Sequence, residues 1–252
     1  MQPFLRLSWW GRLAAAIIVL TTVGCSAPVN ELAGFDPAPP STLVIELSPP
    51  STMAAVVATA VGTEVVVFDQ PSPTAAERER FANPIASGSP LVFQVVDQRQ
   101  GWLQVLLPVR PNGSTGWIES DQVALSQTPY RIEIDASDHH LRVLKQGQPI
   151  VDAAVGIGTG DNPTPIGSFY LIELLAPPDP TGPYGPYAFG LSGYSETLES
   201  FNGGRGVVGI HGTNDPASLG RDVSHGCIRV ANDIIEDMAT YLPLGTPVII
   251  SP

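Results

Sequence analysis

Charged residues are scarce in this sequence, and basic residues are the scarcer kind. Only 14% of the 252 residues are charged, with 12 lysines and arginines against 24 aspartates and glutamates, so the formal net charge is -12. A chain with this balance repels nucleic acid instead of neutralising its phosphates. No basic patch with interleaved aromatic residues offsets that repulsion, and we expect no nucleic-acid partner.

Cysteine is almost absent, because the chain contains only Cys25 and Cys227. If Cys25 is modified or removed with a leader, Cys227 has no partner for a disulfide. An unpaired thiol that is retained in this way invites a chemical explanation. On the cysteine count alone, a buried structural cysteine stays an equal alternative.

Long apolar runs are also rare, and the clearest covers residues 13–23 near the N-terminus. It follows Arg6 and Arg12, is too short to span a bilayer comfortably, and is followed by Gly24 and Cys25. The pattern resembles a bacterial lipoprotein signal, in which the cysteine receives a lipid and becomes the new N-terminus. An ordinary secretory signal and an uncleaved anchor are the alternatives. We therefore predict a signal at 1–24, membrane attachment through Cys25, and export to the outer face of the cytoplasmic membrane, the cell wall or the periplasmic space.

Glycine and proline, by contrast, are abundant, and they favour short strands and turns over long helices. Residues 25–53 are rich in Pro, Ser and Ala and are predicted to be a tether. Residues 54–127 contain short apolar strands, with two Gly-Trp strand starts at Trp102 and Trp117 that flank an Asn-Gly turn. This segment resembles a bacterial SH3-like domain. It would bind cell wall or position the following domain, or serve as a β-barrel spacer with both tryptophans in its core.

Longer strands are predicted from residue 130 to the end, at 131–136, 141–144, 150–157, 169–175, 207–211 and 246–250. One amphipathic helix precedes the last strand, with Asn232 as the expected N-cap. Its apolar stripe comprises Ile234, Ile235, Met238, Ala239 and Leu242. The expected fold class is mainly β: a small SH3-like β-barrel at 54–127, then a β-rich catalytic domain with one or two helices at 130–252.

The chemistry is concentrated in two short motifs, His211-Gly212-Thr213 and Ser224-His225-Gly226-Cys227. A cysteine nucleophile needs a neighbouring base or cation and a group that orients the base. It also needs N–H donors for the oxyanion of a tetrahedral intermediate. Gly226 permits a tight turn that aims backbone N–H groups at one point. The two motifs together therefore offer a nucleophile, a base and oxyanion donors.

Other cysteine and histidine chemistries fit less well. Zinc binding by His211, His225 and Cys227 is chemically possible, but no usual fourth-ligand motif accompanies them. In papain-like peptidases the cysteine precedes the histidine in sequence, whereas here His211 comes first. Sortases have the order His, Cys, Arg, but with much wider spacing. We expect no metal site.

The motifs resemble the catalytic signature of the YkuD-type L,D-transpeptidases, and the segment 162–169 resembles that family's Thr-Pro-x-Gly-x-Phe segment. The resemblance implies that Cys227 is the nucleophile and His211 the base, with the Gly212 carbonyl fixing the imidazole tautomer. His225 corresponds to the second active-site histidine, with Ser224 holding it or the loop. The N–H groups of Gly226 and Cys227 would form the oxyanion hole, with His225 as a further candidate.

The resemblance also suggests residues that contact substrate. Arg229 would order the loop or pair with a substrate carboxylate, and both roles stay open. The Pro- and Gly-rich stretch 177–190, which carries Tyr184 and Tyr187, would be a flap over the site.

The activity implied by the resemblance is formation of 3→3 cross-links in peptidoglycan through a cysteine acyl-enzyme, without a metal or organic cofactor. The partners would be donor and acceptor stem peptides, and carbapenems would be inhibitors. Two alternatives stay open: a related L,D-carboxypeptidase or protein or D-amino-acid attachment activity, and a catalytically inactive wall-binding lipoprotein.

Overall fold

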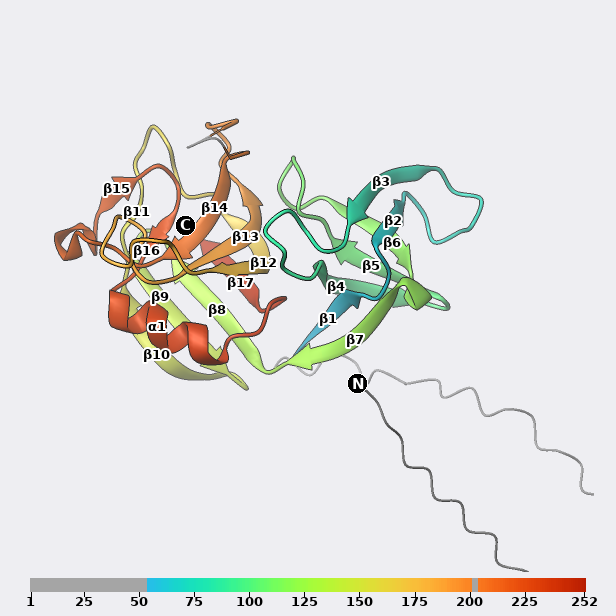
Figure 1. Cartoon of the computed structure of the whole chain (residues 1–252), viewed down its shortest axis with the longest axis horizontal. Helices are drawn as coiled ribbons and strands as arrows, with labels where there is room; N and C mark the ends of the chain where they lie inside the picture. The colour runs from blue at the N-terminus through green and yellow to red at the C-terminus, as the bar shows by residue number, and fades with distance from the viewer. Residues whose placement is uncertain (1–53, 201–203) are drawn as a thin grey trace, which may run out of the picture. The chain divides into compact units, whose positions relative to one another are not determined.

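The computed structural model describes residues 54–200 and 204–252, all within one compact unit of the chain (Figure 1). The predicted signal at 1–24, Cys25 and the tether at 25–53 lie outside the described residues. The described part is mainly β, with one α-helix, so the predicted fold class is confirmed. Two large sheets carry the structure, one formed before Pro129 and one after it.

The N-terminal sheet contains seven strands in the spatial order β3-β2-β6-β5-β4-β1-β7, with antiparallel neighbours. The strands are β1 (Ala55–Ala60), β2 (Glu64–Phe68), β3 (Glu77–Ala82), β4 (Val92–Arg99), β5 (Trp102–Leu106), β6 (Thr115–Glu119) and β7 (Val123–Thr128). A short 3₁₀ helix, Ser120–Gln122, precedes β7. We call this region, residues 54–128, the N-terminal domain.

Both tryptophans of the N-terminal domain pack inside it. Trp102 is 8% exposed and Trp117 is 6% exposed, and Phe68 meets Trp102 edge to face with 5.4 Å between ring centroids. They serve as packing residues, as the spacer interpretation expected, and they offer no open aromatic platform. The resemblance of this domain to SH3-like domains stays a prediction.

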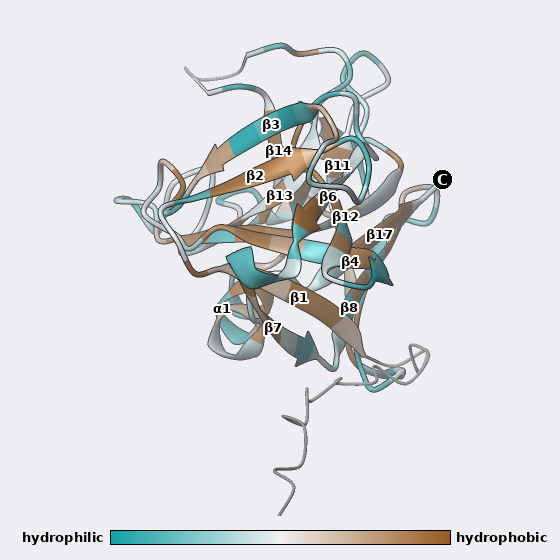
Figure 2. Ribbon diagram, turned by 90° about the vertical axis from the view of Figure 1, so that its right-hand side faces the viewer, coloured by the Kyte–Doolittle hydropathy of each residue, from teal (hydrophilic) through white to brown (hydrophobic). Residues whose placement is uncertain are grey.

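The edge strand β3 was not predicted from the sequence. Its first four residues are charged and exposed, and it appears largely hydrophilic in Figure 2. Charged side chains are a common way to protect the edge of a sheet from pairing with other chains. Arg80 on this strand forms ion pairs with Glu64 and Glu77.

The second sheet has eight strands in the order β10-β9-β8-β17-β12-β13-β14-β16. Its strands are β8 (Tyr130–Asp135), β9 (His140–Lys145), β10 (Gln148–Ala154), β12 (Gly167–Leu175), β13 (Ala188–Tyr194), β14 (Val207–His211), β16 (Ile228–Arg229) and β17 (Pro247–Ser251). Two short strands, β11 (Ile157–Gly158) and β15 (Asp222–Ser224), pair separately, and a 3₁₀ helix covers Pro216–Ser218. We call residues 130–252 the catalytic domain.

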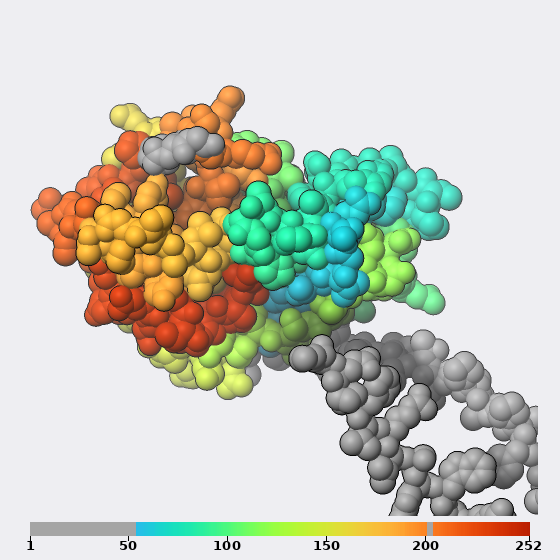
Figure 3. All heavy atoms as spheres, viewed as in Figure 1, coloured from blue at the N-terminus to red at the C-terminus, as the bar shows by residue number. Residues whose placement is uncertain are grey.

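The core of the catalytic domain is built by alternation along its strands. Parallel pairing of β17 with β8 sets Val248 opposite Ile132 and Ile250 opposite Ile134, and all four side chains are at most 1% exposed. Strand β13 begins at Ala188, so the stretch predicted as a loop up to Gly190 ends at Tyr187. The remaining loop, residues 176–187, lies at the surface (amber spheres in Figure 3).

The single helix α1 (Asn232–Tyr241) buries Ile235 and Met238 against this core, as the apolar stripe predicted. The expected N-cap is wrong. Ala231 occupies the N-cap position, and Asn232 is the first residue of the helix. The Asn232 side chain instead accepts a hydrogen bond from the Thr213 N–H over 2.8 Å, which ties the helix to the loop after His211.

A small apolar cluster joins the two domains. Val57, Val92 and Leu106 of the N-terminal domain pack with Tyr170 of β12, which is fully buried. The Tyr170 hydroxyl donates to the Leu106 carbonyl over 3.1 Å, so its polar end is satisfied.

Candidate active site

The strand pairing of the catalytic domain brings the two motifs together. Strand β14 ends at His211, and its parallel neighbour β16 begins one residue after Cys227, with Ile210 opposite Ile228 and His211 opposite Arg229. A cavity of about 220 Å³ opens there. Six of the predicted site residues line it: Tyr184, His211, Ser224, His225, Cys227 and Arg229. The other lining residues are Pro183, Ser195, Leu198, Gly206, Val207 and Val208.

His211 is buried and held by its own neighbour. Its Nδ1 lies 2.6 Å from the Gly212 carbonyl oxygen, so Nδ1 carries the proton and donates it, and Nε2 is left as an acceptor in the neutral ring. The pKa of His211 is lowered from 6.5 to about 4, mainly by burial; the bond to Gly212 opposes this shift, and the positive charge of Arg229 adds to it. His211 is therefore a neutral imidazole at neutral pH, suited to accept a proton.

Cys227 is a partly buried thiol in the same cavity. Burial raises its pKa above the ordinary 9.0, while a backbone hydrogen bond from Gly209 and the positive charge of Arg229 both lower it to a smaller extent. The thiol is therefore protonated at neutral pH. A neutral His211 beside a protonated Cys227 fits a mechanism in which the base takes the thiol proton as the sulfur attacks.

Ser224 fastens the turn that carries Cys227. Its hydroxyl donates to the Cys227 carbonyl over 2.6 Å and accepts the Gly226 N–H over 3.0 Å. Ser224 was expected to hold either His225 or the loop, and these two hydrogen bonds hold the loop. Because the Gly226 N–H already donates to the Ser224 hydroxyl, the structure does not support its expected role as an oxyanion donor. The Cys227 N–H remains the candidate donor.

A third hydroxyl contact comes from Thr164, for which no individual role was predicted. Thr164 Oγ1 donates to the Gly226 carbonyl over 3.0 Å and accepts the Gly158 N–H over 2.9 Å. Gly226 has φ of +116°, a region that side chains rarely adopt, so the backbone bends here at a glycine. Ser224 and Thr164 together fix three consecutive peptide groups around Cys227.

Tyr184 packs on His211 from the side of the loop 176–187. Its ring centroid lies 4.8 Å from that of His211. The loop that carries Tyr184 packs closely on Gly212. A Cβ added at Gly212 would lie 2.4 Å from Asn232 Oδ1 and 3.0 Å from the Cα of Gly185, the residue after Tyr184. Asn232 and Gly185 are thus further residues that shape the site. No short sequence pattern marks them, since their partners are distant in sequence.

The remaining predicted residues take different places. His225 is exposed at the cavity. Tyr187 packs against the core of the catalytic domain and is not among the residues that line the cavity. Arg229 lines the cavity, and its Nε is buried without a hydrogen-bond partner in the described part of the chain.

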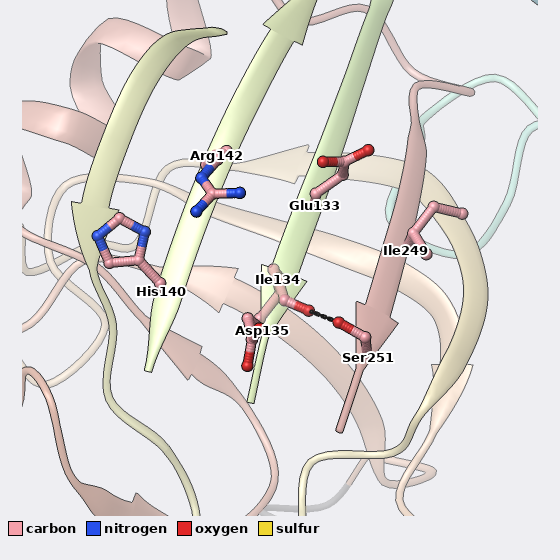
Figure 4. Close-up of a pocket in the computed structure, with 7 residues that line it drawn as sticks. All are labelled: Glu133, Ile134, Asp135, His140, Arg142, Ile249 and Ser251. Carbon is pink, nitrogen blue, oxygen red and sulfur yellow. Dashed lines mark hydrogen bonds between the residues drawn. The ribbon is translucent and has the colours of Figure 1, made fainter. Parts of the chain in front are cut away.

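A second hollow lies away from this chemistry, over β8, β9 and β17 (Figure 4). Glu133, Asp135, His140 and Arg142 give it a mixed charge, and the Ser251 hydroxyl donates to the Ile134 carbonyl at its floor. It contains none of the predicted site residues. Within residues 54–200 and 204–252, no three potential metal ligands gather, and no helix is long and apolar enough to cross a membrane.

Comparison with known proteins identifies the family of residues 129–250. Residues 129–250 match the family model of the YkuD L,D-transpeptidase catalytic domain. The L,D-transpeptidase YkuD of Bacillus licheniformis is 31% identical over 156 residues, which cover 59% of this chain and 86% of that protein. The YkuD of Bacillus subtilis is 33% identical over 123 residues, covering 49% of this chain and 66% of that protein.

A solved L,D-transpeptidase structure from Mycobacterium smegmatis is also similar, with 15% identity and a TM-score of 0.42. That likeness covers 65% of this chain and 92% of the other. The family-model match at 129–250 includes the strands of the second sheet and both motifs. This chain belongs to the YkuD family of L,D-transpeptidases.

Proposed function

We propose that this protein forms 3→3 cross-links between peptidoglycan stem peptides through an acyl-enzyme on Cys227. The observation that carries the proposal is the state of His211. It is neutral, its Nδ1 is committed to Gly212, and its ring lines the same cavity as Cys227.

In the first half-reaction, the Cys227 sulfur attacks the carbonyl carbon of the third stem residue, and His211 Nε2 takes the thiol proton. The developing oxyanion is stabilised by the Cys227 N–H, held in place by the contacts of Ser224 and Thr164 around it. The bond to the terminal D-alanine breaks, and His211 returns the proton to the leaving amine. A thioester remains on Cys227.

In the second half-reaction, the side-chain amine of another stem's third residue attacks the thioester. His211 takes a proton from this amine and returns it to the departing sulfur, so a new amide forms and the free thiol is restored. Water in place of the amine would give an L,D-carboxypeptidase, and a protein amine or D-amino acid would give an attachment reaction. Arg229 is the cation of the cavity that suits a substrate carboxylate.

Incubation of the purified protein with a disaccharide-tetrapeptide, followed by mass analysis, tests the proposal. We expect a cross-linked dimer and released D-alanine. A trimmed monomer would favour the carboxypeptidase, and no reaction would favour an inactive wall-binding protein. Cys227→Ala is the matched control, and residual cross-linking above about 1% of the wild-type rate would contradict the assignment of the nucleophile.

A further inference from the structure

The loop between β5 and β6 of the N-terminal domain reaches the catalytic domain through one arginine. The Arg110 guanidinium donates hydrogen bonds to three backbone carbonyls after β13: Ser195 over 3.1 Å, Leu198 over 2.8 Å and Arg205 over 3.0 Å. All three partners lie more than 80 positions away in sequence. A planar guanidinium can bridge several carbonyls at once, which a lysine ammonium does less well.

Two further contacts secure the end of β13 to the same loop. Asn112 forms a reciprocal pair with the Tyr194 backbone, accepting its N–H over 2.9 Å and donating to its carbonyl over 2.8 Å. The Tyr194 hydroxyl donates to the Pro108 carbonyl over 2.8 Å, and the Arg110 guanidinium lies 4.6 Å from the Tyr194 ring centroid. We call Pro108, Arg110 and Asn112 the clamp.

The backbone held by the clamp is part of the active-site cavity. Ser195, Leu198 and Gly206, which we call the wall, line that cavity together with Cys227. The Ser195 N–H donates to the Gly206 carbonyl over 2.8 Å, so the two ends of this wall are joined beside Arg110. Strand β14, which begins at Val207, leads directly from this wall to His211.

Gly206 gives independent evidence for how closely the clamp fits. Its φ is +69°, and an added Cβ would lie 2.3 Å from the Leu198 carbonyl oxygen and 3.1 Å from Arg110 Nη2. A side chain at this position would push the wall away from the guanidinium. The wall and the clamp are therefore fitted to each other.

We propose that Arg110 and Asn112 are positioning residues for catalysis, through which the N-terminal domain sets the wall that receives the stem peptide. The identity of the stem peptide as the substrate rests on the proposed function. The positioning of the wall by Arg110 and Asn112 does not depend on it. A surface segment with few buried apolar contacts depends on such bonds to keep one arrangement. Charged donors to carbonyls are the stronger kind.

The test compares Arg110→Ala, Arg110→Lys and Asn112→Ala with Arg99→Ala in the full-length protein. Arg99 is a matched control, because it lies in the same domain and its guanidinium is 4.7 Å from the Trp117 ring centroid, but its ion-pair partner Asp97 belongs to the N-terminal domain. The readouts are kcat and KM for the tetrapeptide, alkylation of Cys227 by iodoacetamide, the melting temperature, and hydrogen exchange at the Tyr194 and Ser195 amides.

For Arg110→Ala we expect KM to rise roughly ten-fold, the factor associated with one charge-assisted hydrogen bond, with faster exchange at both amides. The KM and the amide exchange rates of Arg110→Lys should lie between those of the wild type and those of Arg110→Ala. Alkylation of Cys227 should stay unchanged, because iodoacetamide does not need the wall. Asn112→Ala removes the reciprocal pair of hydrogen bonds with the Tyr194 backbone. If Arg110→Ala does not fold, this variant still tests whether the clamp holds the wall.

Exchange rates and KM equal to those of Arg99→Ala would overturn the inference. A wild-type protein that does not react with the tetrapeptide would refute the proposed function alone. In that case the amide exchange of the clamp variants would still decide whether the clamp holds the wall.

Discussion

The hydroxyl of Thr164 donates to the carbonyl of Gly226, 62 positions along the chain and directly before Cys227, the proposed nucleophile. In a planar trans peptide the C=O and the following N–H point in opposite directions. By fixing the Gly226 carbonyl, Thr164 therefore fixes the direction of the Cys227 N–H, the candidate oxyanion donor. A side chain outside both motifs thus shapes the centre of the site.

Replacing Thr164 with valine keeps its shape and removes its hydroxyl. We expect acylation of Cys227 by the tetrapeptide to slow by roughly 10²-fold, near the lower limit for loss of an oxyanion-hole donor. Single-turnover mass analysis measures this rate. Thr164→Ser, which keeps the hydroxyl, should retain most of it. Equal rates in the two variants would show that this hydroxyl does not orient the site.

Burial of His211 should make stability depend on pH. Its native pKa of about 4 lies below the ordinary 6.5, so between these values the unfolded chain binds a proton that the native state excludes. The free energy of unfolding should therefore fall as the pH drops from 6.5 towards 4, and this contribution should level off below 4. The loss is roughly 3 to 4 kcal/mol at most, at about 1.4 kcal/mol per pKa unit.

Denaturant unfolding at pH 7 and pH 4.5, in the wild type and in His211→Gln, measures that contribution. The variant lacks the titrating ring, so its stability should change less between the two pH values. If both proteins lose the same free energy, His211 is not buried in its neutral form.

The positive charge of Arg229 lowers the pKa of both Cys227 and His211. In Arg229→Gln, the pH midpoint for alkylation of Cys227 should move up from a wild-type value that already lies above 9.0. Arg229→Lys, which keeps the charge, should shift it less. Arg221→Gln is the control, because this exposed arginine does not line the cavity. A midpoint unaffected by Arg229→Gln would contradict the electrostatic role.

An activated β-lactam carbonyl should acylate the same thiol. We expect intact-mass analysis with a carbapenem to show one adduct, on Cys227, and none in Cys227→Ala. Thr164→Val should form the adduct more slowly, since the same oxyanion donor is used. A protein that cross-links stem peptides but forms no adduct with any carbapenem would refute this expectation.

Export is predicted from residues outside the described part of the chain. Cys25→Ala should leave the membrane fraction or accumulate as an uncleaved precursor, as shown by fractionation and N-terminal mass analysis. Unmodified Cys25 at the N-terminus of a processed, soluble wild-type protein would exclude the lipid anchor.

Elements with strong periodicity were predictable from the sequence. The strand at 207–211 has the predicted bounds, and the apolar stripe of α1 is buried as expected. Strand β3 escaped prediction because it is an edge strand whose charged residues face solvent, so it lacks the alternation that marks a half-buried strand. Strand β13 begins in a stretch whose prolines and glycines predicted a loop.

The site was predictable as far as its two motifs extend. The sequence predicted that His211, Ser224 and Cys227 belong to one site, and all three line the same cavity in the structure. Thr164 and the Asn232 side chain were missed, because each acts through a backbone group that only tertiary folding brings near. The protonation states of His211 and Cys227 were missed as well, because they depend on burial, which a motif does not encode.

The raised pKa of Cys227 has a consequence beyond the reaction itself. Peroxide and other oxidants attack the thiolate, so a thiol that stays protonated at rest is oxidised slowly. Sulfinic and sulfonic acids at this position would be dead ends, and the described part of the chain offers no second cysteine to rescue the sulfenic acid as a disulfide. In the proposed mechanism the thiolate forms only when His211 takes the proton, so the cavity would protect Cys227 from oxidation between turnovers.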